Sequence, residues 1–388
     1  MTADYCTLAS SYVEELRARS SEIDAQRSVP QDLAERLAQD GFYRLCTPKA
    51  LGGVAAPPKT LAQVCEILAN GNGSVAWCVF IGATSQYMFP AASPQLIQEL
   101  LVDPSLITSG VFAYSGHARS DAATNSWRVS GRWDWGSGCH NAGWISGGVL
   151  LQDDNGDPIL NSGGHPAEAR AFFKPKELTI HDNWHTSGLK GSGSSSFTAA
   201  DVILADYRIA RVDDLSTSEH VNTPLYRFPR FGYLALPIGA IALGMAQDAL
   251  SEALAVAKSK TPTGSRRTLA SRPAFHTEIA LADTSLRAAH LTFYNDIDHA
   301  WSEAQDQTGS LSTRQKLRTS TAHAVTTSAQ VIDRMYTVVG GTSIYEESAL
   351  QRHFRDVHVA SQHMMVSEPV MELAGRVITG VEDNAPGL

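Results

Sequence analysis

One short segment of this 388-residue chain gathers two indole rings, a histidine and several small polar residues. It reads WDWGSGCH over residues 133–140 and ends a stretch in which apolar and polar residues alternate with the period of a strand. Its glycines and Ser137 expose N–H and O–H groups beside Trp133 and Trp135, which suits a flat heteroaromatic ring. A tight turn with core tryptophans accounts for the same residues, so both interpretations stand.

A second segment, WHTSGLKGSGSSS over residues 184–196, is dense in glycine and hydroxyl groups. Successive backbone N–H groups in such a loop can cradle an anion. The same composition is equally typical of a flexible connection, and the spacing does not separate the two interpretations.

Two histidines near the C-terminus, His358 and His363, follow an Arg-Asp pair at 355–356. On one continuous helix they would lie about 140° apart, so they cannot chelate a metal together. Either one can act as a general base, because the pKa of histidine lies near neutrality. For each of them a structural role on the helix is the alternative interpretation.

The elements that must position these residues follow from hydrophobic periodicity. The first hundred residues predict helices that begin near Pro30, Leu61, Ser74 and Pro94. The helix from Ser74 is apolar on every side, which is typical of a buried helix. Glycine, β-branched and aromatic residues then alternate, and a strong hairpin turn lies at Asp154-Asn-Gly. This middle part predicts an antiparallel β unit.

Helical periodicity returns after about residue 225. We expect helices over 237–258, 273–303, 312–339 and 349–379, the third of them opened by a capping box. Helices, then strands, then helices form an α+β organisation, so we expect three domains. Their bounds are 1–104 for a helical domain, 105–215 for a central β domain and 216–388 for a helical bundle.

Composition and charge exclude several classes of function. Lysine and arginine total 31 against 40 acidic residues, a formal charge of −9, so neither nucleic acid nor an anionic membrane is an expected partner. The longest apolar stretch, 233–246, is shorter than the roughly 20 residues of a membrane span. The first residues do not resemble a signal peptide. Five cysteines without a CxxC pair predict neither disulfides nor a metal site, so we expect a cytoplasmic protein.

Five segments, taken in order, resemble one family. They are 41–53, 73–77, 130–139, 184–194 and, after Gly340-Gly341, 350–358. The chain thereby resembles the flavin-dependent monooxygenases built on the acyl-CoA dehydrogenase fold, which are the oxygenase components of two-component aromatic hydroxylases. The resemblance extends from about residue 22 to residue 380. It implies an N-terminal helical domain, a central antiparallel β-barrel or sandwich and a C-terminal four-helix bundle.

One departure separates the chain from true acyl-CoA dehydrogenases. Those enzymes place a glutamate base in the loop after the Arg-Asp pair, and the corresponding position here falls near Met364, beside His363. No acidic residue follows until Glu368, and none occurs over 230–247, where other such enzymes carry the base. Dehydrogenation of an acyl thioester is therefore poorly supported, whereas a histidine in this loop is what the hydroxylase relatives use.

The resemblance also implies a cofactor and a set of site residues. The cofactor is reduced FAD, with FMN as the alternative, and O₂ is the co-substrate that adds to it as a hydroperoxide. His363, or else His358, is the expected base, and Ser137 is expected to hydrogen-bond the flavin. Further cofactor-binding residues are expected at Val111, Phe112, Ser115, Trp135, Gly138, Arg266, Gly340 and Gly341. The expected substrate pocket comprises Trp77, Phe80, Trp133 and Met364, and Lys190, Ser192 and Ser194 are expected to shape one of the two sites.

The implied partners are a separate NAD(P)H:flavin reductase and a small electron-rich aromatic substrate of the indole or phenol type. Arg266, with Arg267 and Arg272 as alternatives, and the Gly340-Gly341 pair would reach a neighbouring subunit's flavin, which implies a homotetramer or a dimer. Three other functions compete with this one. They are N-oxygenation of an amino sugar on the same fold, acyl-CoA dehydrogenation, and non-catalytic ligand binding.

Overall fold

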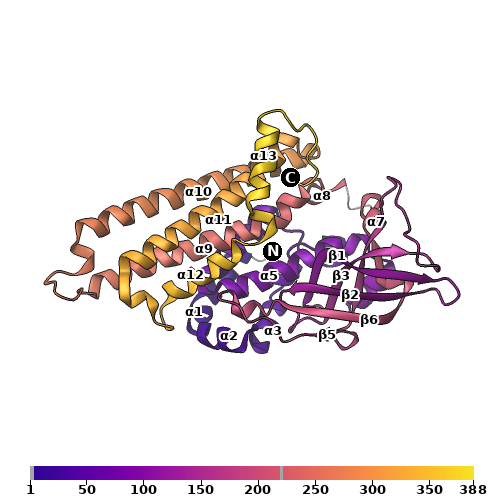
Figure 1. Ribbon diagram of the computed structural model, residues 1–388, viewed down its shortest axis with the longest axis horizontal. Coiled ribbons are helices and arrows are strands. Elements are labelled where there is room, and N and C mark those ends of the chain that lie inside the picture. Colours follow the sequence, from indigo (N-terminus) through magenta and orange to yellow (C-terminus); the bar gives the residue numbers. More distant parts are fainter. Residues whose placement is uncertain (1–3, 219–221) are drawn as a thin grey trace.

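A computed structural model describes residues 4–218 and 222–388 of the chain. Helices come first, a sheet follows, and long helices complete the chain (Figure 1). The helices of the N-terminal part are α1 (Tyr5–Ala18), α2 (Ser20–Gln26), α3 (Gln31–Gln39), α4 (Pro58–Gly71), α5 (Gly73–Ser85) and α6 (Pro94–Leu101). They share one apolar core with the C-terminal helices.

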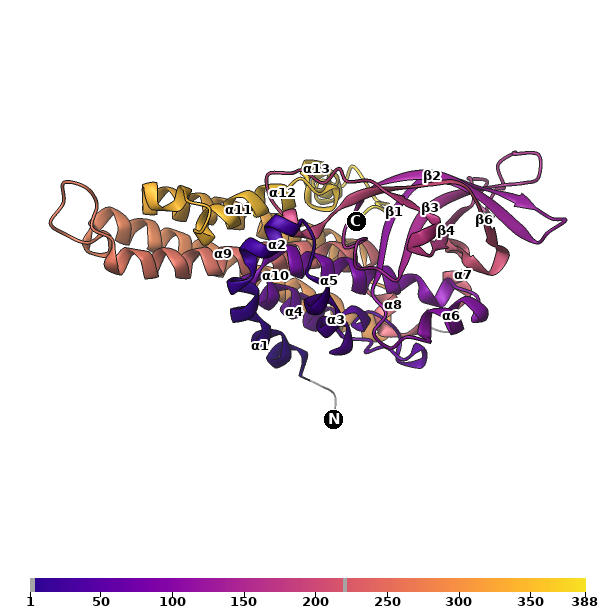
Figure 2. The same ribbon diagram turned by 90° about the horizontal axis from the view of Figure 1, so that it is seen from below.

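Helix α5 is the predicted apolar helix, and it lies between the sheet and the C-terminal helices (Figures 1 and 2). Asn72 begins it, because the Asn72 side chain accepts hydrogen bonds from the backbone N–H groups of Ser74 and Val75. Nearly every residue of α5 is buried, since the helix contacts the sheet on one side and helix α9 on another. Its position is therefore fixed by packing on both sides, and a ligand bound beside α5 would contact a rigid apolar surface.

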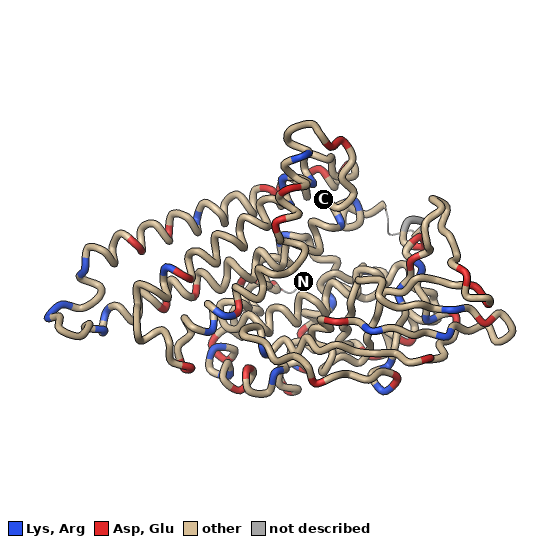
Figure 3. Tube along the Cα trace, in the orientation of Figure 1, with Lys and Arg blue, Asp and Glu red and all other residues tan. Residues whose placement is uncertain are grey.

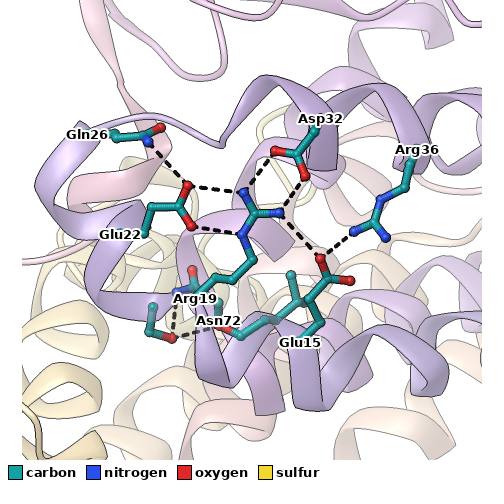
Figure 4. Close-up of polar contacts among 9 residues, drawn as sticks. Glu15, Arg19, Glu22, Gln26, Asp32, Arg36 and Asn72 are labelled. Atoms are coloured by element: carbon teal, nitrogen blue, oxygen red, sulfur yellow. Dashed lines mark hydrogen bonds and ion pairs between the residues drawn. The ribbon is translucent and has the colours of Figure 1, made fainter.

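An ion-pair network joins the first three helices (Figure 4). Arg19 binds Asp32 through both terminal nitrogens, at 2.6 and 2.8 Å, and also contacts Glu15 and Glu22. Glu15 in turn receives Arg36 at 2.5 Å. The network is largely exposed, and exposed ion pairs add little to the free energy of unfolding. We therefore infer that it mainly orients α1, α2 and α3 relative to one another.

The sheet has seven strands in the order β5-β6-β2-β1-β3-β4-β7. They are β1 (Thr108–Asp121), β2 (Ser126–Gly136), β3 (Trp144–Gln152), β4 (Glu168–Phe173), β5 (Thr179–Ile180), β6 (Ser195–Ala205) and β7 (Ile209–Arg211). The expected all-antiparallel unit is wrong in one respect, because β1 and β3 pair in parallel. The sheet is thus mixed. The register between β1 and β3 shifts between Val111 and Gly116, so residues 112–115 of β1 are not paired with β3.

The core of the sheet is centred on Trp133. The ring stacks on Phe197 at 5.3 Å between centroids, and its N–H donates to the Gly148 carbonyl at 2.8 Å. Glycines line the ring because nothing larger fits, and a Cβ at Gly147 would lie 2.4 Å from Trp133 Cε2. Trp133 is therefore a structural residue of the sheet.

We expect Gly147→Ala to destabilise the protein. The added methyl group would overlap the fully buried Trp133 ring, and such overpacking costs typically about 1–3 kcal/mol. Thermal unfolding of the purified variant measures this loss. Gly375→Ala in helix α13 is the matched control, since nothing lies within 4 Å of the added atom and alanine favours a helix by about 1 kcal/mol. Equal melting temperatures for the two variants would contradict the prediction.

The C-terminal part is built on three long helices that lie side by side (Figures 1 and 2). They are α9 (Arg230–Ser259), α10 (Pro273–Asp306) and α11 (Leu311–Val339), with the short α7 (Val212–Thr217) and α8 (Pro224–Arg227) before them. By length and composition α9 is apolar enough to cross a membrane, but 83% of its apolar window is buried inside the protein. It is the central helix of the core.

The expected single helix over 349–379 is wrong. Helix α12 (Ala349–Ala360) ends, a short turn at Met364–Val366 follows, and α13 (Glu368–Ile378) begins in a new direction. Pro369 stands in the first turn of α13, where proline is tolerated but cannot continue a preceding helix. The break places His363 in a loop rather than on a helix face.

Candidate active site

Trp77 of α5 is the residue around which the candidate site forms. Its indole ring contacts His363 and Phe80 edge to face, with ring centroids 5.8 and 5.5 Å away. The indole N–H donates to Ser137 Oγ at 3.1 Å. Helix α5, the end of strand β2 and the loop after α12 therefore meet at one point, and they bring together Trp77, Phe80, Ser137 and His363, four of the residues expected at the site.

A chain of three serine hydroxyls extends from Ser137. Ser137 Oγ lies 2.6 Å from Ser194 Oγ, which lies 2.7 Å from Ser192 Oγ, and Ser192 donates to the Leu189 carbonyl. Because the chain ends on a carbonyl and begins at an indole N–H, each hydroxyl proton points away from Trp77. The Ser137 hydroxyl thus donates its only proton to Ser194 Oγ. It can meet a ligand only as a hydrogen-bond acceptor.

The glycine- and serine-rich loop is held by helix α12. Asp356 is buried and accepts the Leu189 N–H at 2.6 Å, and Arg355 donates to the Ser187 carbonyl at 2.7 Å. Burial raises the pKa of Asp356 to about 6. At the other end of the loop, the Gly138 N–H donates to the Ser192 carbonyl. The segment at 184–196 is therefore a fixed loop and not a flexible connection.

The protonation of His363 is set by its surroundings. Its Nδ1 accepts the Met365 N–H at 3.2 Å, which assigns the proton of the neutral ring to Nε2. Desolvation, followed by the positive charge of Arg318, lowers the pKa of His363 to about 4. At neutral pH the residue is uncharged and presents an N–H. This arrangement opposes the expected role of base and favours that of hydrogen-bond donor.

The irregular part of strand β1 supplies the residues expected at the cofactor edge. Val111, Phe112 and Ser115 all lie at the register shift, with Phe112 half-buried and Ser115 exposed. The buried guanidinium of Arg170 holds this segment, because it donates to the Val111 carbonyl at 2.7 Å and lies 4.2 Å above the Phe112 ring. Ser109 binds the Ser137 carbonyl, which fixes β1 against the end of β2.

Two of the predicted site residues lie elsewhere. Trp133 is enclosed in the sheet core and cannot line a substrate pocket, because its face of the strand packs inward. His358 lies on the outer side of α12, where it contacts Asp333 at 3.0 Å and the Phe354 ring at 4.8 Å. None of its contacts within the described residues reaches Trp77 or Ser137. In this chain His358 is therefore separated from the residues that meet at Trp77.

Trp135 and Met364 stand at the surface beside the site. Trp135 is 73% exposed and adopts a left-handed conformation with φ 64°, which turns the ring out of the sheet. Met364 follows His363 directly and is 77% exposed. Both are large apolar side chains in contact with solvent in the single chain, so each is free to cover a bound ligand.

Arg266 and the two glycines lie at the opposite end of the long helices. The loop between α9 and α10 carries Arg266 and Arg267, both exposed, and Figure 3 shows basic residues gathered there. Lys260 donates to the Val339 carbonyl at 2.5 Å and so joins this end to Gly340. Gly340 has φ 73°, and nothing lies within 4 Å of a Cβ built on Gly341. These residues do not contact the site of their own chain.

Arg318 is the residue that sequence reasoning missed. It lies on α11, is 2% exposed, and donates to the Phe231 carbonyl at 3.2 Å, while its Nε has no partner within the described residues. A signal was available, since Leu317, Thr321 and Val325 share the apolar side of that helix and place Arg318 on its buried surface. A charge in such a position is typical of a ligand site.

Comparison with known protein families shows to which family the chain belongs. A model described as "Acyl-CoA dehydrogenase, N-terminal domain" matches residues 7–102, and one described as "Acyl-CoA dehydrogenase, C-terminal domain" matches residues 236–368. Together the matched residues make up more than half of the sequence. The chain belongs to the acyl-CoA dehydrogenase family. The fold expected from the sequence is thereby confirmed, with the sheet corrected to a mixed one.

Similar members of the family are monooxygenases. An indole-3-acetate monooxygenase from Pseudomonas putida is 27% identical over 94% of this chain and 90% of its own length. The oxygenase component of a p-hydroxyphenylacetate 3-hydroxylase from Acinetobacter baumannii is 27% identical over 92% of this chain and 84% of its own. A flavin-dependent monooxygenase oxygenase subunit, HsaA, from Rhodococcus jostii is 25% identical over 90% and 91%. The resemblance to hydroxylase oxygenase components is confirmed.

Solved structures of other proteins share the fold over the whole chain. The 3-HSA hydroxylase from Rhodococcus sp. RHA1 superposes with a TM-score of 0.88 at 21% identity, covering 100% of this chain and 99% of that one. XiaF from Streptomyces sp., in complex with FADH₂ and glycerol, gives 0.87 at 23% identity, covering 100% and 98%.

Proposed function

We propose that the protein is the oxygenase component of a two-component monooxygenase, which hydroxylates an electron-rich aromatic ring of the indole or phenol type. The observation that carries the proposal is the meeting of Trp77, Ser137 and His363 at the head of the serine chain. The same place in an acyl-CoA dehydrogenase needs a carboxylate base, and here it holds a neutral histidine. Reduced flavin, when bound, supplies the two electrons with which O₂ is divided between product and water.

The residues present fit a reduced flavin. Ser137 Oγ has a free lone pair and no free proton, so it accepts from a cofactor N–H. A reduced flavin carries such an N–H at its central ring, whereas an oxidised flavin has only an acceptor there. Trp135 and the displaced segment 112–115 provide an exposed ring and unpaired backbone beside it. FAD is the proposed form of the cofactor, with FMN as the alternative.

His363 is proposed to donate its Nε2–H to oxygen at the reacting centre. A fixed donor in a water-poor site stabilises developing negative charge more than water does, because it needs no reorganisation. Trp77 and Phe80 are both buried and exclude water from the same place. The aromatic ring of the substrate is proposed to lie against these two side chains.

The far end of the bundle is proposed to serve a neighbouring subunit. Arg266, Gly340 and Gly341 do not contact their own site, but they combine exposed basic charge with backbone that a large ligand can approach closely. We propose that they bind the flavin's phosphates in a homotetramer, or in a dimer. The electron donor is proposed to be a separate NAD(P)H:flavin reductase, as in the two-component relatives, and the cytoplasm is the proposed location.

The function is tested by anaerobic loading of the protein with reduced FAD, followed by oxygenated buffer with or without indole-3-acetate or 4-hydroxyphenylacetate. We expect a hydroxylated product with either or both rings and H₂O₂ in their absence. Absence of product with both compounds and with indole and phenol, together with reduction of oxidised FAD by an acyl-CoA on a second sample of the protein, would establish a dehydrogenase instead.

We expect Ser137→Ala to reduce the preference of the protein for reduced over oxidised FAD. The variant loses the acceptor that only the reduced flavin can use, which is worth about tenfold in affinity. Equilibrium titration with both redox states measures the ratio of dissociation constants. Ser130→Ala is the control, since Ser130 lies on strand β2, which ends directly before Ser137, and binds Asp201 at the surface. An unchanged ratio in Ser137→Ala would contradict the proposed contact.

A further inference from the structure

Arg318 is a buried cation without an acidic partner. No carboxylate of the described residues lies within 4.0 Å of it, although the chain pairs many of its exposed arginines. Burial lowers the pKa of Arg318 to about 10, so the guanidinium still carries its charge at neutral pH. An unpaired buried charge costs free energy, and a protein normally compensates such a charge or uses it.

The orientation of the guanidinium leaves its bidentate edge unused. Its Nη1 is bound to the Phe231 carbonyl, and its Nε has no partner. No hydrogen bond of Nη2 is present either within the described residues. Nε–H and Nη2–H point in parallel from the same edge, which is the geometry that receives the two oxygens of one carboxylate.

The position of Arg318 connects this edge to the candidate site. The turn at Met364–Val366 packs against both α9 and α11, the two helices that Arg318 and Phe231 join. The positive charge of Arg318 also contributes to the lowered pKa of His363, in agreement with this packing. His363 in turn contacts Trp77. A ring bound against Trp77 would therefore lie beside His363, next to the turn that packs against the helix carrying Arg318.

We propose that Arg318 binds the carboxylate of the substrate, so that the substrate is an aromatic acid rather than a neutral arene. This inference rests on the proposed function and narrows it. It differs from the expectation from the sequence, in which all four pocket residues are uncharged. An arylacetic acid has the required form, with an electron-rich ring and a carboxylate one carbon away.

The test compares acids with their neutral amides. The probes are indole-3-acetate against indole-3-acetamide and 4-hydroxyphenylacetate against 4-hydroxyphenylacetamide, titrated into the protein with and without reduced FAD under anaerobic conditions. The wild-type protein is expected to bind at least one acid about 10- to 100-fold more tightly than its amide, as a charge-assisted bidentate pair allows. Arg318→Met is expected to abolish this preference and to leave the affinity for the amide unchanged.

Two further variants keep the test decisive. Arg318→Lys retains the charge but not the planar fork, and we expect it to lose part of the preference, which also covers the case in which Arg318→Met does not fold. Arg314→Met is the matched control, because Arg314 lies one turn earlier on α11 and binds the Ala385 carbonyl. It is expected to keep the wild-type preference.

The outcomes separate this inference from the proposed function. A wild-type protein without preference for the acid in both pairs, or an Arg318→Met variant that keeps the preference, would overturn the carboxylate site even if hydroxylation is observed. An Arg318-dependent preference for the acid without hydroxylation of any probe would support the site and contradict the monooxygenase.

Discussion

A His363→Phe protein is expected to form hydroxylated product at about one hundredth of the wild-type yield per O₂ consumed. Phenylalanine keeps an aromatic edge against Trp77 but removes the Nε2–H, and loss of one fixed donor at a reacting centre costs about 10²- to 10³-fold. O₂ consumption continues, so H₂O₂ replaces the product. Product and H₂O₂ are both quantified in the same reaction.

His358→Phe is the control for this prediction. His358 precedes His363 by five residues, yet it contacts Asp333 and Phe354 on the outer side of α12. Its variant is expected to keep the wild-type yield. The reverse result, with loss of product in His358→Phe alone, would show that the geometry has been assigned to the wrong histidine.

The pH dependence distinguishes a donor from a base at His363. Because its pKa is lowered to about 4 in the folded protein from an ordinary value of 6.5, the ring does not titrate near neutrality. We expect the yield of product to show no step attributable to His363 between pH 6 and 8. As the pH falls from 6.5 towards 4, the unfolded chain binds the proton more readily, so this residue progressively destabilises the fold. His363→Phe should therefore lose less stability in acid than the wild type does.

Asp248→Ala is expected to destabilise the protein by about 3–5 kcal/mol, because it leaves buried partners without compensation. Asp248 of α9 receives Arg17 of α1 at 2.6 Å and His353 of α12 at 2.7 Å, and the His353 side chain is fully buried. Burial opposes ionisation of Asp248, but the hydrogen bond from His353 and the charge of Arg17 hold its pKa below the usual value. The same carboxylate thus connects the N-terminal helix α1 to α12, the helix that precedes the candidate-site loop.

Thermal unfolding measures this effect against a matched surface pair. Asp298 binds Lys59 at 2.7 Å with both side chains exposed, and such pairs contribute little, so Asp298→Ala should unfold near the wild-type temperature. Similar melting temperatures for Asp248→Ala and Asp298→Ala would show that the buried network stabilises the fold no more than an exposed pair. Asp248→Asn, which keeps the shape, should fall between them.

The local sequence pattern is enough to predict the order of the elements and to point to most of the residues that meet at the candidate site. Periodicity identifies a buried helix at α5 and an alternating strand at β2, since both patterns depend on near neighbours in the chain. The segment WDWGSGCH contains Ser137 because its small residues mark a strand end, and the motif order connects it to the family.

Packing between distant segments settles what the local pattern leaves open. Trp133 and Trp135 occupy the same face of a regular strand, yet one is enclosed in the sheet and the other is exposed, because the left-handed conformation of Trp135 reverses its side. The break after α12 moves His363 away from His358, and a helical projection cannot show this. Arg318 lies where α9, α11 and the 364–366 turn meet, and no acidic partner is present there among the described residues. The sequence does not show this, because it depends on how distant segments pack.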